Sequence, residues 1–132
     1  MHHEFFADNP DSKNPLYNTK YGIYSPNCGF DNVLFSFGHD EYMYQVCVRN
    51  QCRIPPQGLA IIRYHSFYPW HKEGDYMYLM DKSDEEKLMW VKRFNECDLY
   101  SKSYTNLPDS KELRNYYENL IRKYFVNSEL RL

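Results

Sequence analysis

The sequence lacks several features that would assign it to a common class of protein. No apolar stretch approaches the roughly 20 residues that a membrane-spanning helix needs, and no basic segment followed by an apolar run marks a signal peptide. No run of lysine and arginine occurs, and the formal net charge is -2. This balance argues against nucleic-acid binding, because nucleic-acid-binding proteins usually present a basic face. We therefore predict a cytoplasmic protein with neither a membrane nor a nucleic-acid partner.

Cysteine is sparse, and its spacing indicates no metal knuckle. The four cysteines are Cys28, Cys47, Cys52 and Cys97, and none forms a Cys-x-x-Cys pair. Because no export signal is found, we expect reduced thiols rather than a disulfide framework.

Strand-like alternation is also missing, whereas helical periodicity is present, so we predict an all-α helical bundle. The 132 residues suggest one domain. Proline, asparagine and aspartate dominate residues 1–27, which predicts an irregular segment, and residues 28–125 form the helical part. Aromatic residues make up 18% of the chain, which provides material for a modest core.

Four helices are predicted within residues 28–125. The first covers about 31–50, with Gly38 as a possible break. Pro55 and Pro56 begin the second, which must end before Pro69. The third and fourth begin at capping boxes over residues 83–86 and 109–112. The fourth helix has an apolar stripe that we expect to be buried, made of Leu113, Tyr116, Tyr117, Leu120, Ile121 and Tyr124.

Three polar residues fall on the apolar stripes of the first three helices: His39, His65 and Asp98. Each histidine has an ordinary interpretation as a core group bonded to a backbone carbonyl. The ordinary interpretation of Asp98 is a salt bridge with Lys102, four residues further along the helix. Two histidines and one carboxylate are also the ligand set of non-haem iron sites, which helical bundles build between facing helices. The pattern alone leaves both interpretations open.

Two further readings concern neighbouring side chains. The pair His39-Asp40 is similar to the dyad of the HD phosphohydrolases, but adjacent helical residues diverge by about 100°, so Asp40 need not join a metal bound by His39. His71 is interpreted as a surface group or a supporting group behind the site. Arg63 and Lys87 are interpreted as solvated charges.

Three long blocks resemble the myo-inositol oxygenase family: NVLFSFGHDEYMYQV, IIRYHSFYPWHKEGDYMYLM and FNECDLYSKS. The resemblance implies an all-helical, HD-domain-like fold and a mixed-valent pair of irons. It also implies cleavage of myo-inositol by O2 to give D-glucuronate. His39, His65 and Asp98 match iron ligands of the family. The resemblance implies substrate binding by Ser66, His65 and Lys102. It also gives Lys102 the catalytic role of stabilising a deprotonated substrate hydroxyl.

The matching blocks correspond to the C-terminal half of the family pattern, which places the chain as a single partial domain. The family's His-Asp dyad that bridges the irons, a further histidine ligand and a substrate lysine have no counterpart here. We therefore expect no activity from the chain alone, and we expect the three ligands to be divided between two irons. The alternative is a non-catalytic fragment that associates with a partner half, a full-length homologue or itself.

Overall fold

The computed structural model describes residues 3–98, 111–126 and 129–132, and all regular structure in these ranges is helical. This confirms the predicted all-α class for the described part of the chain; the HD-like arrangement stays a prediction. None of the described helices is long and apolar enough to cross a membrane. The α-helices are α1 (His39–Arg49), α2 (Pro56–Tyr64), α3 (Tyr68–His71), α4 (Lys82–Asp98) and α5 (Lys111–Tyr124). The 3-10 helices are η1 (His3–Phe6), η2 (Pro10–Lys13), η3 (Phe30–Asn32) and η4 (Met77–Leu79).

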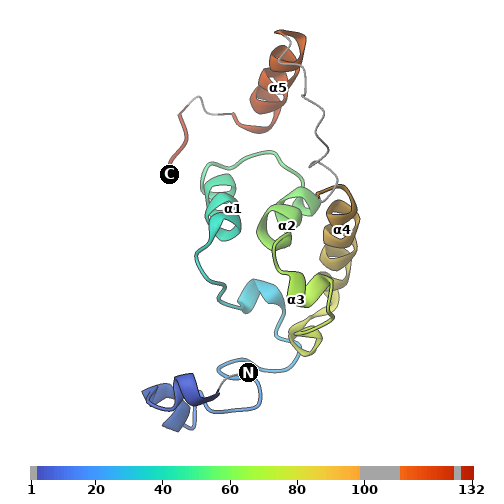
Figure 1. Ribbon diagram of the computed structural model, residues 1–132. Coiled ribbons are helices and arrows are strands. Elements are labelled where there is room, and N and C mark those ends of the chain that lie inside the picture. The colour runs from blue at the N-terminus through green and yellow to red at the C-terminus, as the bar shows by residue number, and fades with distance from the viewer. Residues whose placement is uncertain (1–2, 99–110, 127–128) are drawn as a thin grey trace.

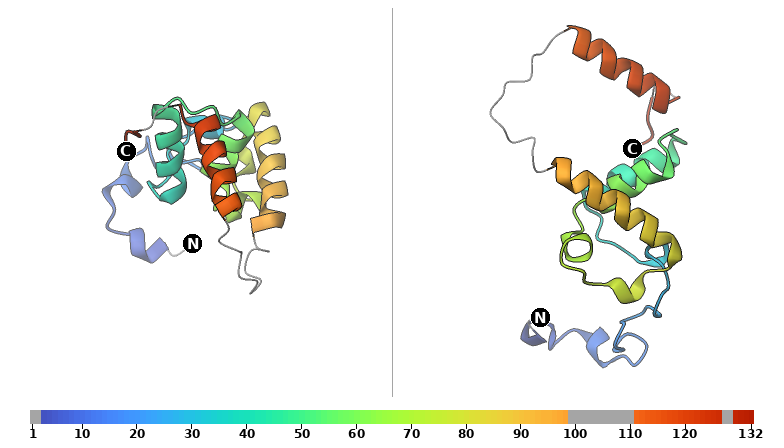
Figure 2. Two further views of the ribbon diagram at one scale, coloured as in Figure 1. Left: turned by 90° about the horizontal axis from the view of Figure 1, so that it is seen from above. Right: turned by 90° about the vertical axis from the view of Figure 1, so that its right-hand side faces the viewer.

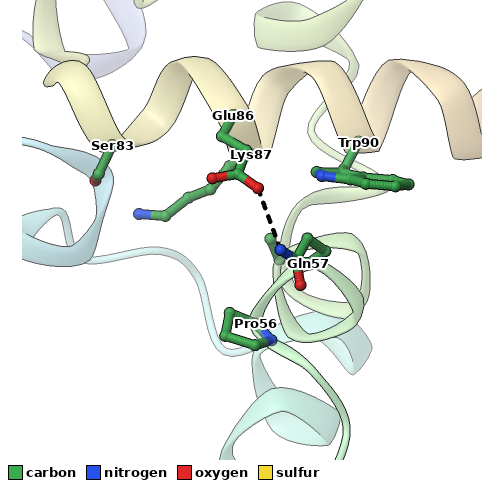
Figure 3. A pocket seen from close by; sticks show the side chains of 7 residues that line it. Pro56, Gln57, Ser83, Glu86, Lys87 and Trp90 are labelled. Atoms are coloured by element: carbon green, nitrogen blue, oxygen red, sulfur yellow. Dashed lines mark hydrogen bonds between the residues drawn. The ribbon is translucent and has the colours of Figure 1, made fainter.

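Helix α2 is the central element of the fold. It lies between α1 and α4 and contacts both, and the short α3 packs against α4 (Figure 1). Gln57 on α2 donates a hydrogen bond to the Glu86 carboxylate on α4 at 3.2 Å (Figure 3). Helix α5 stands at the end of the molecule away from the N-terminal segment, as two directions of view show (Figures 1 and 2). The α1–α2–α4 arrangement brings the start of α1, the end of α2 and the end of α4 to one region.

An aromatic cluster forms the core beneath these helices. The Phe30 and Trp70 rings meet edge to face with centroids 4.7 Å apart, and Phe35 packs edge to face on Tyr64 and Phe67 at 5.5 and 5.3 Å. Edge-to-face packing suits the positive edge and negative face of aromatic rings. The aromatic stretch of residues 64–70 therefore builds the core on one side while it presents His65 and Ser66 on the other.

The predicted first helix begins later than expected. Residues 30–32 form only η3, the chain runs extended through residues 33–38, and α1 starts at His39 after Gly38. Phe35 reaches the core from this extended segment, so its helical spacing to His39 was coincidental. The second helix does begin at the paired prolines, as predicted, but α2 ends at Tyr64. Pro69 then lies in the first turn of α3, where a proline is tolerated.

Helix α4 has a capping box, two residues earlier than the sequence suggested. The Asp81 carboxylate accepts hydrogen bonds from the backbone N–H of Ser83 at 2.7 Å and of Asp84 at 3.2 Å. The Asp84 carboxylate accepts in return from the backbone N–H of Asp81 at 3.1 Å. Asp81 is therefore the cap, and the expected role of Ser83 was wrong because a carboxylate in front of it already satisfies these donors.

The predicted buried stripe on α5 is wrong for this chain. No described residue of α5 is buried, and Tyr116 and Ile121 are each 58% exposed. The stripe has the spacing of a core-facing helix, but the described elements do not cover it. The expected cap residues 109 and 110, and the expected continuation of the third helix beyond Asp98, lie outside the described residues.

The N-terminal segment is attached to the helical part through η4. The backbone N–H groups of Asn27 and Gly29 donate to the carbonyls of Tyr78 and Leu79, both at 2.8 Å. Gly29 has φ +81° and lies so close to the Asp81 carboxylate that a Cβ would overlap it. Glycine is therefore required at this junction for both its conformation and its small size.

Candidate metal and substrate site

Two of the residues singled out by sequence meet directly. His39 is the first residue of α1 and His65 directly follows the last residue of α2, and their Nε2 atoms lie 3.2 Å apart. His39 is exposed and His65 is half-buried. The interpretation of His39 as a core histidine is therefore wrong, because it begins a helix at the surface.

The hydrogen bonds of His65 define which nitrogen is available. Its Nδ1 lies 3.0 Å from the carbonyl oxygen of Ile62. A carbonyl can only accept, so Nδ1 carries the proton in this contact and Nε2 of the neutral ring keeps its lone pair. A histidine that binds a metal usually donates its other N–H in the same way. His65 thus combines the ordinary carbonyl bond with an available ligand atom.

The spacing of the two imidazoles fits one metal ion. Two nitrogens bound at about 2.1 Å and at right angles to each other lie about 3.0 Å apart. The observed Nε2–Nε2 distance of 3.2 Å is close to this value. In the present arrangement the two Nε2 atoms lie within hydrogen-bonding distance, and one of them carries the proton that joins the pair.

Asp98 shares a cavity with the histidine pair. The cavity is about 400 Å³ in volume and is lined by His39, Asp40, Met43, Ile61, Ile62, His65, Phe94 and Asp98. Within the described ranges, however, no three His, Cys, Asp or Glu side chains converge closely enough to hold one metal ion. The histidine pair therefore fits part of a ligand set, and Asp98 does not complete a triad with it.

Ser66 lies beside the pair in a smaller adjoining cavity. Its hydroxyl donates a hydrogen bond to the Asp40 carboxylate. The small cavity is about 130 Å³ in volume and is lined by Phe35, Ser36, Asp40, Glu41, Arg63, Ser66 and Phe67. Burial raises the pKa of the Asp40 carboxyl, but hydrogen bonds from Ser66 and from backbone N–H groups outweigh this effect, so the pKa is lowered overall.

Charged side chains hold α1 and α2 in register behind the site. Arg63 Nε lies 2.7 Å from the Glu41 carboxylate, and both side chains are largely buried. Each partner is two residues from one of the paired histidines, so this ion pair positions His39 against His65. Lys87 lies 2.8 Å from both Asp31 and Asp84. The interpretation of Arg63 and Lys87 as solvated charges was wrong, because both side chains are largely buried and paired with carboxylates.

His71 supports the site from behind. It is only 3% exposed, and its Nε2 lies 2.9 Å from the backbone carbonyl of His65, to which it donates. Of the two predicted roles for His71, the supporting one agrees with this contact. The sequence held no local signal for the bond between Asp40 and Ser66, which are 26 residues apart. Lys102 and its expected pairing with Asp98 lie outside the described residues.

Imidazoles that meet between facing helices are one arrangement by which helical proteins bind a transition metal. The family model for Myo-inositol oxygenase matches residues 1–132. The chain belongs to this family.

Relatives from distant organisms support this assignment. The chain is 58% identical over 119 residues to an inositol oxygenase of Danio rerio, a match that covers 90% of this chain and 42% of the relative. It is 54% identical over 125 residues to inositol oxygenase 5 of Arabidopsis thaliana, which covers 95% and 40%. The inositol oxygenase of Bos taurus is 54% identical over 119 residues, which covers 90% and 41%. The chain thus spans about two fifths of the length of these relatives.

Proposed function

We propose that this chain supplies part of the iron and substrate site of an inositol oxygenase, which cleaves myo-inositol with O2 to D-glucuronate in the cytoplasm. The convergence of His39 and His65, 3.2 Å apart, is the observation that carries the proposal. Family membership supports the choice of reaction, because the relatives named above are inositol oxygenases.

The residues present suit iron as part of a larger ligand set. Imidazole and carboxylate groups are common ligands of non-haem iron. His39 and His65 would hold one iron of the pair, and Asp98 would provide a carboxylate at the same cavity. Iron, when bound, supplies Lewis-acid and O2-activating chemistry. Ser66 would bind a substrate hydroxyl, and Lys102 would stabilise that substrate in its deprotonated form.

The remaining ligands are assigned to another polypeptide segment. The described residues bring no three ligands together, and the chain spans about two fifths of its relatives. Tyr116, Tyr117 and Ile121 of α5 are exposed, and this favours association with such a segment, since large apolar areas rarely stay in water. The alternative hypothesis is a fragment that associates with a partner but takes no part in catalysis, and the experiment below distinguishes the two.

The test is glucuronate formation from myo-inositol with Fe(II) and O2. The 132-residue chain is assayed alone and coexpressed with the portion of the Danio rerio relative that precedes the matched region. We expect turnover only from the assembled pair. His65→Ala should abolish it, whereas Ile62→Val, which trims the same cavity without removing a ligand, should keep most of it.

Two results would contradict the proposal. An assembled pair that binds iron but forms no glucuronate would favour the non-catalytic fragment. Turnover by the chain alone that disappears in His65→Ala would show that copies of this chain complete the site among themselves.

A further inference from the structure

The Asp40 carboxylate lies where the two cavities of the site adjoin. It lines the larger cavity together with His39, His65 and Asp98, and it also lines the smaller one together with Ser66. Asp40 follows His39 in sequence and Ser66 follows His65. The two dipeptides therefore make two side-chain contacts. One joins the imidazoles, and the other joins the Asp40 carboxylate to the Ser66 hydroxyl.

The hydrogen bonds of Asp40 restrict what Ser66 can do. One Asp40 oxygen accepts from the backbone N–H of Glu41 at 3.1 Å, and the other accepts from the Ser66 hydroxyl. A hydroxyl has one proton, and in this contact the Ser66 hydroxyl is the donor, so its proton is directed at Asp40. The lone pairs of the Ser66 oxygen are then the part of the hydroxyl that remains available to a ligand.

We propose that Asp40 is a positioning residue, which fixes the Ser66 hydroxyl so that Ser66 acts as a hydrogen-bond acceptor for a hydroxyl of the polyol substrate. This inference rests on the proposed function, since it takes the substrate contact of Ser66 from there. It also gives Asp40 a role other than the one suggested by the His-Asp dyad. The carboxylate orients the neighbouring serine, and no cluster of three ligands forms around it among the described residues.

Asp40→Asn tests the direction of the hydrogen bond with little change in shape. The amide oxygen of the variant can still accept from the Glu41 N–H, which leaves the NH2 group facing Ser66. The serine oxygen must then accept from Asn, and its proton turns toward the cavity, so Ser66 becomes a donor. Ser66→Ala removes the hydroxyl, and Ser12→Ala, at an exposed position in η2 that lines neither cavity, is the matched control for losing a serine.

The first measurement uses the 132-residue chain and needs neither metal nor activity. Exchange of the Ser66 hydroxyl proton with water is followed by NMR. Since a hydrogen bond typically contributes about 1 kcal/mol, we expect exchange roughly fivefold to tenfold faster in Asp40→Asn. Equal exchange rates in the two proteins would overturn the proposal, because the proton would then not be held by Asp40.

The second measurement separates positioning from general damage. In the assembled oxygenase, Asp40→Asn and Ser66→Ala should each raise the KM for myo-inositol roughly tenfold, with a smaller effect on kcat. In the Ser66→Ala background, Asp40→Asn should have no further effect on KM, and Ser12→Ala should leave KM unchanged. An equal effect of Asp40→Asn in both backgrounds would overturn the proposal. If the wild-type assembly forms no glucuronate, the proposed function and the substrate role of Ser66 fail, while hydroxyl exchange still decides the Asp40 contact.

Discussion

Replacing Arg63 by methionine should be among the most damaging single changes in this chain. Its guanidinium pairs with Glu41 at 2.7 Å, and the two side chains are 10% and 12% exposed. Removing one partner of a buried ion pair typically costs about 3–5 kcal/mol, because the other charge is left buried and unpaired. Glu41 would keep a hydrogen bond from Gln45 at 2.7 Å. We therefore expect Arg63→Met to lower the free energy of unfolding by about 3 kcal/mol, the lower end of this range.

Urea unfolding followed by tryptophan fluorescence measures this loss, since Trp70 is fully buried in the aromatic core. Combining Arg63→Met with Glu41→Gln removes the unpaired charge, so the double variant should recover most of the stability. Lys72→Met, which removes an exposed cation in the same way, should change the stability by less than about 0.5 kcal/mol. A loss below about 1 kcal/mol for Arg63→Met, or no recovery in the double variant, would refute the reasoning.

Two further predictions concern α4 and the thiols. Asp81→Ala should cost about 1 kcal/mol of unfolding free energy at pH 7 through loss of the helix cap. Hydrogen bonds from Ser83 lower the folded-state pKa of Asp81, so this contribution should be present above the ordinary carboxyl pKa and disappear as the pH falls below it, which acid titration of both proteins would show. Burial raises the pKa of the Cys47 thiol to about 11, so iodoacetamide at pH 8 should label exposed Cys97 first and Cys47 last in the folded chain. Mass spectrometry gives the order, and early labelling of Cys47 would contradict the burial of this thiol on α1.

The helices that the sequence predicted well have local signals at their ends. Paired prolines begin α2, and the Asp81 carboxylate caps the start of α4. The start of α1 was placed too early because Phe35 has helical spacing to His39, yet it packs into the core from an extended segment. The burial expected for α5 depends on a surface outside the described elements. Periodicity shows that a helix has an apolar face but not what covers that face.

The site was predictable only in part. Helical spacing drew attention to His39 and His65, and the family resemblance assigned them a metal. Their contact joins residues 26 apart in sequence, which no spacing rule contains. The same holds for the hydrogen bond from Ser66 to Asp40 and for the ion pair of Arg63 with Glu41, 22 residues away. Charged residues that looked solvated one by one are buried because the fold brings their partners to them.

The most direct test of the central claim is a Co(II) titration of the 132-residue chain, followed by NMR of the histidine ring protons. If His39 and His65 form a metal-binding pair, their signals should shift or broaden together at the lowest Co(II) concentrations, and His39→Ala should remove the effect at His65. The Nε2 of His71 is hydrogen-bonded to the carbonyl of His65 and is not a ligand. The His71 signals should therefore show only the distance-dependent paramagnetic effect of the nearby Co(II). Equal responses of all the histidines, or an unchanged response of His65 in His39→Ala, would contradict a shared site.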